Sequence, residues 1–582
     1  MSAQSAGIRP PERTHRARAS LFLLIPLALA IAAYRRVLAA PFVWDDEPGI
    51  LLNPVVRDLG ALAPGQLARE MLGAGRPVTD LTFALNHAVA GFAPSSFHAT
   101  NLAIHLAAVA LVFLFTRRLA RLARAAKGDA IAIATAGVFA LHPIQTEAVS
   151  YVVQRSEVLA SGLYVLVLLL LLSAERHGRT WRGGVAWGGA LLAYVLALAS
   201  KPVAVTAPAA YLLATLAADR GAEARSELTS WPRRAALVAP FFAIAGGLAV
   251  SMLVGLRGDV GAGMDIPGLQ PLEYLTTELK VVVLYARLLV WPAGQNVDWD
   301  FPVFTSLLQP GVLASGAFLL ALAGGGVALM AWGRARAGEA AAAARLAGLG
   351  ILWFFLLLSV TSSVIPIADL VFEHRLYLAS WGVFLAVAVG LERLAARLAL
   401  GPAWVAAIVV GVWCSLAVAT WARNAVWEGP EPLWRDAMER SPEKARPYIG
   451  LGDSLSAQGR YDEAGAVYAA GLERAGGSAY YEAALLGGLG NAQALAQRWG
   501  EAAASFRAAL EREPSASEYH ARLGSVLLEL GDVASADFHV RRSLELDPRD
   551  ACKAWRDALA LGIGERARRR TVELLATECA TR

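Results

Sequence analysis

Charge and cysteine are both scarce in this chain. Asp, Glu, Lys and Arg make up only 17% of the 582 residues, whereas hydrophobic residues make up 56%. A soluble domain cannot bury so much apolar surface, so an ordinary soluble protein is excluded. The sequence also lacks GxxxxGK[ST] and a dinucleotide fingerprint, which argues against a nucleotide-binding enzyme. The net charge of +5 is modest and the basic residues lie in short loops, so no nucleic-acid partner is expected.

The three cysteines are Cys414, Cys552 and Cys579, and none stands at a metal-ligand spacing with histidine. No metal centre of that type is therefore predicted. Cys414 lies within an apolar run and is predicted to be a packing residue. Cys552 and Cys579 lie 27 residues apart near the C-terminus, where a disulfide between them is compatible with the sequence.

Apolar runs close to the length of a membrane span recur from residue 19 to about residue 420. They include residues 98–116, 158–174 and 350–368. Only helices and closed barrels satisfy their backbone in lipid, and these runs have helical length. The sequence therefore predicts an all-α, polytopic membrane domain, with 19–34 as an uncleaved first helix.

The basic loops set the orientation of these helices. Arginine and lysine gather in the N-terminal tail and in the segments 117–127, 175–184, 219–234, 333–338 and 391–401. The positive-inside rule assigns all of them to the cytoplasm if 273–292 does not fully cross. That segment carries four charged residues, Glu273, Glu278, Lys280 and Arg287, and is predicted to be re-entrant or interfacial. About eleven spans follow, and the residues after 420 lie outside.

The C-terminal region has a different pattern. Ala464, Ala502 and Ala536 align with spacings of 38 and 34 residues, and Pro514 and Pro548 are 34 apart. A 34-residue helix–turn–helix period with small residues at the crossing predicts a short tetratricopeptide-repeat α-solenoid. Such a solenoid is either a stability or dimer surface, or a groove for an extended peptide.

Three acids cluster where the first span ends, in FVWDDEPGILLNP (42–54). Asp45, Asp46 and Glu47 are either a hydrated helix end or a site for a general base. Neighbouring carboxylates raise each other's pKa toward the useful range. They also offer oxygen ligands for a divalent cation, so one at Asp45 and Asp46 stays an open alternative.

Further polar clusters fall on the same predicted side of the membrane. Each cluster can also be explained without a catalytic role, as a hydrated loop, an interfacial helix or a long basic side chain that snorkels to the membrane surface. Together they offer acids to take a proton and cations to hold a negative group at a hydrophobic boundary, which suits transfer of a group from a lipid phosphate to a hydroxyl. The candidate residues are Arg76, His142, Glu147, Arg155, Lys201, Glu373, His374, Arg375 and Tyr377.

These motifs resemble one known family when taken in order. FVWDDEPGILLNP, RPVTDLTFALNHAVAG, FALHPIQTEAVSYVVQRSEVLA, ELKVVVLYARLLVWP and FEHRLYL precede the repeats. This order resembles the transmembrane and tetratricopeptide-repeat O-mannosyltransferases, which are GT-C glycosyltransferases related to the protein O-mannosyltransferases. The resemblance covers residues from about 20 to about 550. The repeat region here is short, and the Ala-, Gly- and Arg-rich composition suggests a bacterial member.

The resemblance implies a sugar donor on a polyprenyl phosphate and a Ser or Thr hydroxyl acceptor on an extracytoplasmic protein. It implies an inverting single displacement in which Asp45 or Asp46 is the base and no metal cofactor is required. Glu47 is an extra acid at the substrate. Arg155, Lys201 and Arg375 are the candidates for the phosphate, with His374 near the sugar. The lipid is undecaprenyl phosphate in a bacterium or dolichyl phosphate in a eukaryote, and the acceptor can also be a glycan or lipid.

The expected organisation has four parts: a cytoplasmic tail (1–18), a catalytic membrane domain (19–422) with its first external loop at 41–97, a linker (423–445) and an extracytoplasmic repeat domain (446–582). In a bacterium the active site and the repeats would face the periplasm, and in a eukaryote the lumen of the endoplasmic reticulum. Two other functions stay open. One is a non-catalytic membrane scaffold that presents its repeats to a partner, and the other is a lipid-linked sugar transporter.

Overall fold

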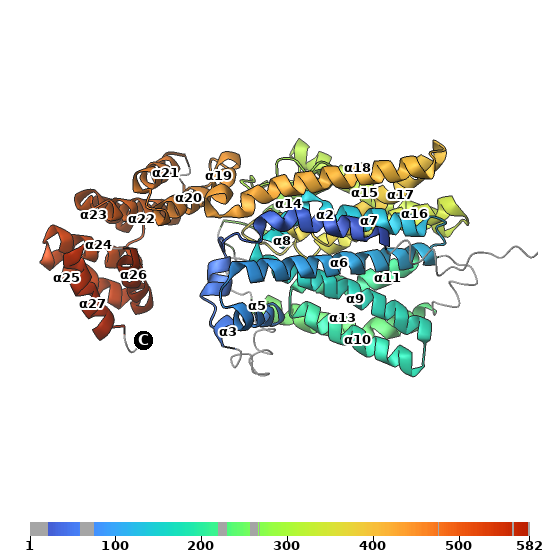
Figure 1. The fold of residues 1–582 in the computed structure, drawn as a ribbon, viewed down its shortest axis with the longest axis horizontal. Coiled ribbons are helices and arrows are strands. Elements are labelled where there is room, and N and C mark those ends of the chain that lie inside the picture. Colours follow the sequence, from blue (N-terminus) through green and yellow to red (C-terminus); the bar gives the residue numbers. More distant parts are fainter. Residues whose placement is uncertain are drawn as a thin grey trace, which may run out of the picture. The chain divides into compact units, whose positions relative to one another are not determined.

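The computed structural model describes residues 21–58, 75–218, 230–255, 263, 266, 268–474, 477–561 and 564–579. The predicted cytoplasmic tail at 1–18 lies outside the described residues. The chain divides into two compact units, one comprising Met1–Gln295 and Phe301–Glu428 and the other comprising Asn296–Asp300 and Gly429–Arg582. All secondary-structure elements of the described residues are helices (Figure 1), which confirms the predicted all-α class.

The first unit contains the predicted membrane spans. Eight helices in the described part of the chain are long and apolar enough to cross a bilayer. They are α6 (Pro94–Leu122), α9 (Arg155–His177), α10 (Trp181–Leu198), α13 (Trp231–Gly255), α15 (Pro310–Arg334), α16 (Glu339–Leu358), α17 (Ala379–Arg397) and α18 (Pro402–Arg423). The prediction of about eleven spans is therefore supported for eight helices of the described residues. Two shorter apolar helices are α7 (Gly128–Leu141) and α11 (Ala207–Leu216), which continues the 3₁₀ turn η6 (Pro202–Thr206). The predicted first span contains the 11-residue helix α2 (Leu24–Tyr34).

The segment predicted not to cross forms helix α14 (Pro271–Val290). It has 20 residues, which is long enough to cross a bilayer, but it is not among the apolar helices because charged residues interrupt its apolar run. A capping box at Gln270 and Glu273 fixes its start. Its buried face carries Glu278 and Tyr285, which turn toward the candidate site described below.

Close backbone approaches hold several spans together. Helices α9 and α10 lie side by side and form one of the closest pairs in the unit (Figure 1). Between α16 and α17, an added Cβ at Gly350 would lie only 2.2 Å from the carbonyl oxygen of Gly382. Small residues permit such contact, and membrane helices rely on it because lipid supplies no hydrophobic drive for their association.

Cys414 was predicted to be a packing residue, and this prediction is wrong. It is an exposed free cysteine on α18. The reason is that α18 lies at the margin of the bundle and buries only 17% of its apolar window. An apolar run in sequence therefore does not distinguish a face that packs against protein from a face left for lipid.

Short helical segments between the spans carry most of the candidate residues. The membrane unit places several of them together because the spans that flank them pack against one another. They are η1 (Arg35–Val37), η2 (Glu47–Leu51), α3 (Pro54–Arg57), α5 (Pro77–Ala90), η4 (Pro143–Gln145), α8 (Thr146–Ser150), η5 (Val152–Gln154), η7 (Glu373–Leu376) and η8 (Asn424–Glu428).

The second unit is a row of helical hairpins. Its helices are α19 (Pro430–Arg440), α20 (Ala445–Ala457), α21 (Tyr461–Arg474), α22 (Ala479–Leu495), α23 (Trp499–Arg512), α24 (Ser517–Leu530), α25 (Val533–Leu546), α26 (Pro548–Leu561) and α27 (Glu565–Thr577). Ala464, Ala502 and Ala536 are fully buried where helices cross, as the repeat spacing predicts. The segment predicted as a linker contains α19, which packs on α20.

Cys552 and Cys579 form a disulfide, with their Cα atoms 5.9 Å apart. The bond joins α26 to the residues just after α27. Disulfides persist mainly in oxidising compartments. Its presence agrees with the extracytoplasmic side that the positive-inside rule assigns to these residues.

Candidate functional site

The three acids of the first external loop have different surroundings. Asp46 is fully buried, and its two carboxylate oxygens accept hydrogen bonds from the backbone N–H groups of Val43 (3.1 Å) and Val153 (2.7 Å). Burial raises the pKa of Asp46 to about 7, and the neighbouring charge of Asp45 adds to the rise. Asp45 and Glu47 are exposed. Asp46 therefore ties the loop to η5, whereas Asp45 faces outward.

An aromatic stack fixes Asp45. Trp44 has a φ of 51°, in the left-handed region that a bulky residue rarely adopts. Its indole stacks on the Tyr151 ring, with the centroids 5.8 Å apart and the planes 12° apart. Tyr151 also stacks on Trp427, and its hydroxyl oxygen accepts the backbone N–H of Asp45 at 2.8 Å. Burial, together with the charges of Asp45 and Asp46, holds the pKa of Tyr151 well above its ordinary value.

Glu147 and His374 form a buried pair between α8 and η7. The Nδ1 atom of His374 lies 2.6 Å from the Oε1 atom of Glu147, and the backbone N–H of Glu373 donates to the Oε2 atom at 2.9 Å. The Glu373 carboxylate accepts a hydrogen bond from Gln295 at 2.5 Å. Burial raises the pKa of Glu147 to about 8, and the nearby charge of Glu373 adds to it. Because Nδ1 is engaged, Nε2 is the ring nitrogen that His374 can present to a ligand.

Three cations surround this histidine: Arg76, Lys201 and Arg375, here called the cation cluster. Burial is the main reason that the pKa of His374 lies well below its ordinary value. The charges of Lys201, Arg375 and Arg76 lower it further. The imidazole is therefore neutral. Burial also lowers the pKa of Lys201, which the Arg76 and Arg375 charges lower further and Glu157 opposes. The charges of Arg76, Lys201 and Arg375 therefore act on the pKa values of their neighbours, which means that these groups lie close together.

Each member of the cation cluster is held by its neighbours. The Nζ atom of Lys201 lies 2.8 Å from the Oε2 atom of Glu157 and donates to Gln154. Arg375 donates to the backbone oxygens of Asp369 (2.7 Å) and Leu370 (2.9 Å). Arg76, at the start of α5, donates to the Ser156 hydroxyl at 3.2 Å. These contacts fix the positive groups in place without neutralising all three.

The aromatic ring of Phe372 connects the acid loop to His374. Its centroid lies 6.2 Å from that of Trp44 on one side and 5.0 Å from that of His374 on the other. Arg375 lies over the same ring, with Cζ 5.4 Å from the centroid. The rings of Trp44 and Phe372 therefore connect the loop that carries Asp45 to His374 and Arg375.

Arg155, a predicted phosphate ligand, lies elsewhere. It is fully buried and donates to Asn101 (2.6 Å), Asn86 (2.6 Å), Thr82 and the backbone oxygen of Phe97. Its guanidinium also lies over the Phe83 ring, 4.4 Å from the centroid. These contacts join α5, α6 and α9. Arg155 thus uses its donors to pack the helices that carry the site.

Two further predicted residues also bind within the protein core. Tyr377 pairs through its hydroxyl with the Nδ1 atom of His105 at 2.7 Å. His142 accepts the backbone N–H of Ile144 at 3.2 Å and packs on Phe384, and burial lowers the pKa of this histidine to about 3. Neither side chain joins the cation cluster. The sequence placed both near the site because they are close to Glu147 and Arg375 along the chain.

Sequence reasoning missed two carboxylates, Glu157 and Glu278. Glu157 is the partner of Lys201, although no acid adjoins Lys201 in sequence. Glu278 is buried, and neither of its oxygens has a hydrogen-bond partner in the described part of the chain. Burial raises the pKa of Glu278 to about 7, and the Arg375 charge opposes that rise. For both residues the sequence signal was a charged side chain within an apolar segment. This signal helps to assign the topology but does not indicate a role in the site.

The open alternative of a divalent cation concerns Asp45 and Asp46. Each Asp46 oxygen accepts one backbone N–H group, and Asp45 and Glu47 are exposed. Among the described residues, no group of three or more His, Cys, Asp or Glu side chains is arranged to hold a metal ion. A cation at Asp45 and Asp46 stays a prediction.

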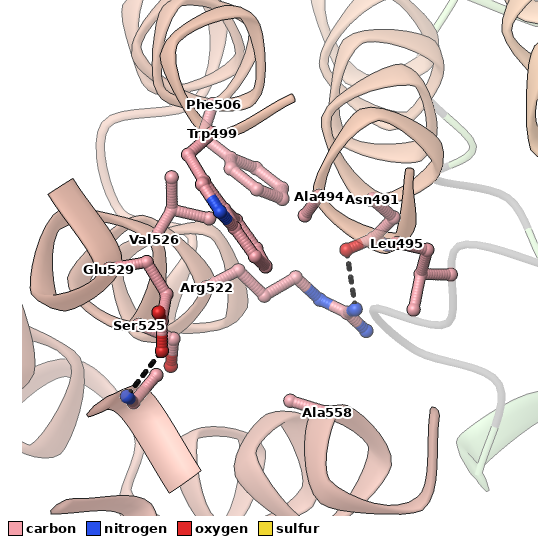
Figure 2. Close-up of a pocket in the computed structure, with 11 residues that line it drawn as sticks. Asn491, Ala494, Leu495, Trp499, Phe506, Arg522, Ser525, Val526, Glu529 and Ala558 are labelled. Atoms are coloured by element: carbon pink, nitrogen blue, oxygen red, sulfur yellow. Dashed lines mark hydrogen bonds between the residues drawn. The ribbon is translucent and has the colours of Figure 1, made fainter. Parts of the chain in front are cut away.

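The repeat unit has a pocket of its own between α22, α23 and α24. Figure 2 shows Trp499 and Phe506 beside Arg522, which donates to the Asn491 side chain at 2.6 Å. Glu529 accepts the backbone N–H of Ala567 at 2.5 Å and so caps the start of α27. The pocket combines aromatic surface with polar side chains on a helical repeat.

Comparison with known proteins agrees with this architecture. A family model described as tetratricopeptide repeat matches residues 517–550. Protein O-mannosyl-transferase Tmtc2 of Drosophila melanogaster is 35% identical over 214 residues, covering 34% of this chain and 21% of that protein. This chain is homologous in part to protein O-mannosyl-transferases. Human protein O-mannosyl-transferase TMTC1 is 38% identical over 146 residues, covering 23% of this chain and 16% of that protein.

Mouse protein O-mannosyl-transferase TMTC3 is 29% identical over 302 residues, which cover 50% of this chain and 28% of that protein. The matched part of the chain thus spans between 16% and 28% of the length of these three relatives. A solved structure titled APC/C hetero-tetramer Cut9-Hcn1 aligns with a TM-score of 0.22 and 14% identity, covering 85% of this chain and 87% of that chain. So low a TM-score bears on neither fold nor function.

Proposed function

We propose that the chain is an integral-membrane glycosyltransferase. It transfers a sugar from a polyprenyl phosphate to a hydroxyl of an extracytoplasmic protein. The observation that carries the proposal is the chain of ring contacts from Trp44, beside the exposed Asp45, through Phe372 to the neutral His374, whose pKa three cations lower. The partial homology to protein O-mannosyl-transferases supports mannose as the sugar and Ser or Thr as the acceptor.

The reaction follows from the placement of these groups. Asp45 removes the proton from the acceptor hydroxyl, and the hydroxyl oxygen attacks the anomeric carbon of the sugar. The bond from that carbon to the phosphate oxygen breaks, the configuration inverts, and the polyprenyl phosphate leaves with the bonding electron pair. Lys201, Arg375 and Arg76 stabilise the negative charge on the departing phosphate. No covalent enzyme intermediate is needed.

The surrounding groups orient the donor. His374 presents Nε2 to the sugar or the phosphate, because Glu147 holds Nδ1. Glu278 lies beside Arg375, with Ser362 and Tyr274 close to its carboxylate, and neither of its oxygens has a hydrogen bond of normal geometry within the described part of the chain. Such groups suit hydroxyls of the sugar, since a buried carboxylate without partners carries a desolvation cost that a ligand hydroxyl would relieve. The helical hairpins of the repeat unit are the part of the chain that would hold a segment of the acceptor protein, because helical repeats form extended binding surfaces.

The test is sugar transfer by the purified full-length protein in nanodiscs. A panel of undecaprenyl- and dolichyl-phosphate sugars is offered with Ser/Thr-rich peptides. The panel also identifies the lipid, and with it the compartment in a bacterium or a eukaryote. Transfer that depends on the polyprenyl phosphate and is lost in a folded Asp45→Asn variant supports the enzyme.

The matched control is Asp58→Asn, which makes the same change at another exposed acid of the same loop. It should retain transfer. If Asp45→Asn transfers as well as wild type, Asp45 is not the base. If the folded wild type transfers no sugar from any donor, while the repeats bind a partner, the scaffold function replaces this proposal.

A further inference from the structure

A second cavity lies at the other end of the membrane helices from the acid loop. It has a volume of about 630 Å³ and opens between the end of α9, the start of α10 and the start of α13. Its lining includes Glu175, Arg179, Thr180, Gly184 and Arg233. Helix α9 begins at Arg155 near the candidate site and ends at His177 beside this cavity, so the two regions are separated by roughly 33 Å of helix.

The cavity carries an excess of positive charge. Arg179 and Arg233 are exposed, and neither has a hydrogen bond or ion pair in the described part of the chain. Glu175 does not neutralise them, because Arg234 donates to one of its oxygens at 2.8 Å and the Tyr211 hydroxyl donates to the other. Arg234 thus pairs with Glu175, and within the described part of the chain Arg179 and Arg233 remain as two positive charges without an ion-pair partner.

The helix ends reinforce this charge. The cavity is lined by the first turns of α10 and α13, whose N-terminal backbone dipoles favour an anion. Trp181 and Trp231 begin these helices and are 74% and 43% exposed. Exposed tryptophans at the ends of spans are characteristic of the interfacial zone, at the depth of lipid headgroups. The basic loops assign this end of the helices to the cytoplasm.

We propose that this cavity binds the phosphate headgroup of an anionic phospholipid from the cytoplasmic leaflet. Arg179 and Arg233 bind the phosphate oxygens through charge-assisted hydrogen bonds, and the exposed apolar flanks of α10 and α13 contact the acyl chains. The occupant is a lipid because the helices that line the cavity also carry exposed apolar residues, such as Val185 on α10, which is 66% exposed. The site is independent of the proposed transferase chemistry.

The site has a structural consequence for the other end of the bundle. Helices α9 and α10 pack closely along their length and carry Glu157 and Lys201 at or just beyond their far ends. A lipid that bridges the near ends of α9, α10 and α13 would stabilise the pair of helices that positions Lys201. Binding should therefore raise the thermal stability of the protein.

The experiment measures lipid binding to the delipidated full-length protein in detergent by native mass spectrometry. Dioleoylphosphatidylglycerol is compared with dioleoylphosphatidylcholine, with sodium phosphate as a competitor. The Arg179→Gln/Arg233→Gln double variant should bind phosphatidylglycerol roughly thirtyfold more weakly, since each basic residue near a membrane surface contributes about one factor of five. Arg182→Gln is the matched control, because Arg182 lies in the same turn but lies against the Trp181 ring and does not line the cavity.

A second variant tests the cavity without altering charge. A Cβ added at Gly184 meets no heavy atom within 4 Å, so Gly184→Leu fits and fills the space. It should weaken phosphatidylglycerol binding while both arginines remain. The proposal is overturned if both variants bind phosphatidylglycerol as well as wild type, if phosphatidylcholine binds equally, or if sodium phosphate alone displaces the lipid.

Discussion

The Oδ1 atom of Asp46 accepts a hydrogen bond from the backbone N–H of Val153 at 2.7 Å, across 107 residues of sequence. Its Oδ2 atom accepts a second bond from Val43. Asp46 thus connects the first external loop to the turn before α9 through hydrogen bonds. Asp46 therefore has a structural role, whereas the adjacent Asp45 is the proposed base.

The first prediction concerns that separation. Asp46→Asn should destabilise the protein by about 1–3 kcal/mol, because an amide can accept only one of the two backbone N–H groups and leaves the other buried and unsatisfied. Asp45→Asn should lower the thermal midpoint less than Asp46→Asn, because Asp45 is exposed, and should reduce sugar transfer. Thermal unfolding and transfer assays on the two variants measure this. Equal loss of stability in both variants would contradict the assignment.

The second prediction concerns pH. The pKa of Asp46 is raised to about 7 and that of Glu278 to about 7, so the folded state binds more protons than the unfolded state. These groups stabilise the fold fully below about pH 4, and this stabilisation is lost as the pH rises through about 7. The thermal midpoint should fall between about pH 5 and about pH 8.

A neutral substitution isolates the second of these groups. Glu278→Gln removes one titrating carboxylate without changing the size of the side chain, so the midpoint should depend less on pH in this variant than in wild type. The control is Glu273→Gln, at the exposed start of the same helix. A pH dependence identical in all three proteins would rule out ionisation of Glu278 as a cause.

The third prediction separates Arg155 from Lys201. Arg155→Lys should cost about 3 kcal/mol or more of stability, because a lysine cannot make the four side-chain and backbone contacts of the buried guanidinium. Lys201→Gln should also cost stability, because it leaves the buried Glu157 carboxylate without its charge partner, but unlike Arg155→Lys it should in addition raise KM for the lipid donor or lower kcat in the folded protein. The measurement is a melting curve together with donor-dependent kinetics for each variant. A stable Arg155→Lys protein with a raised donor KM would return Arg155 to the phosphate site.

The fourth prediction concerns the disulfide. Its loop is 27 residues long, so Cys552→Ser should destabilise the repeat unit by about 3.5 kcal/mol in the chain-entropy account. Cys414→Ser is the control and should have little effect, since Cys414 is exposed and free. Unfolding of the full chain followed by repeat-specific proteolysis measures this. A Cys552→Ser melting curve that overlays the control would mean that helix packing alone holds the end of the repeats.

Sequence pattern was sufficient for the fold class. Hydrophobic runs of membrane-spanning length predict helices because lipid leaves the backbone few alternatives, and its charges distinguish α14 from the apolar helices. The repeat period predicts the second unit because small residues such as Ala536 must recur wherever helices cross. These signals are local or periodic, so they can be recognised in the sequence alone. The exposure of Cys414 shows the limit, since sequence does not say which face of an apolar helix meets protein.

The candidate site depended on contacts between distant segments. Charge alone made Arg155 and Lys201 equivalent, and only packing placed Arg155 among Asn86 and Asn101 while Lys201 joined Glu157. Likewise, adjacent Asp45 and Asp46 point to different environments because Trp44 adopts a left-handed backbone conformation. The sequence determined the membrane helices, the repeats and the supply of acids and cations. Tertiary structure decided which of these groups are buried, because desolvation and hydrogen-bond partners depend on neighbours far along the chain.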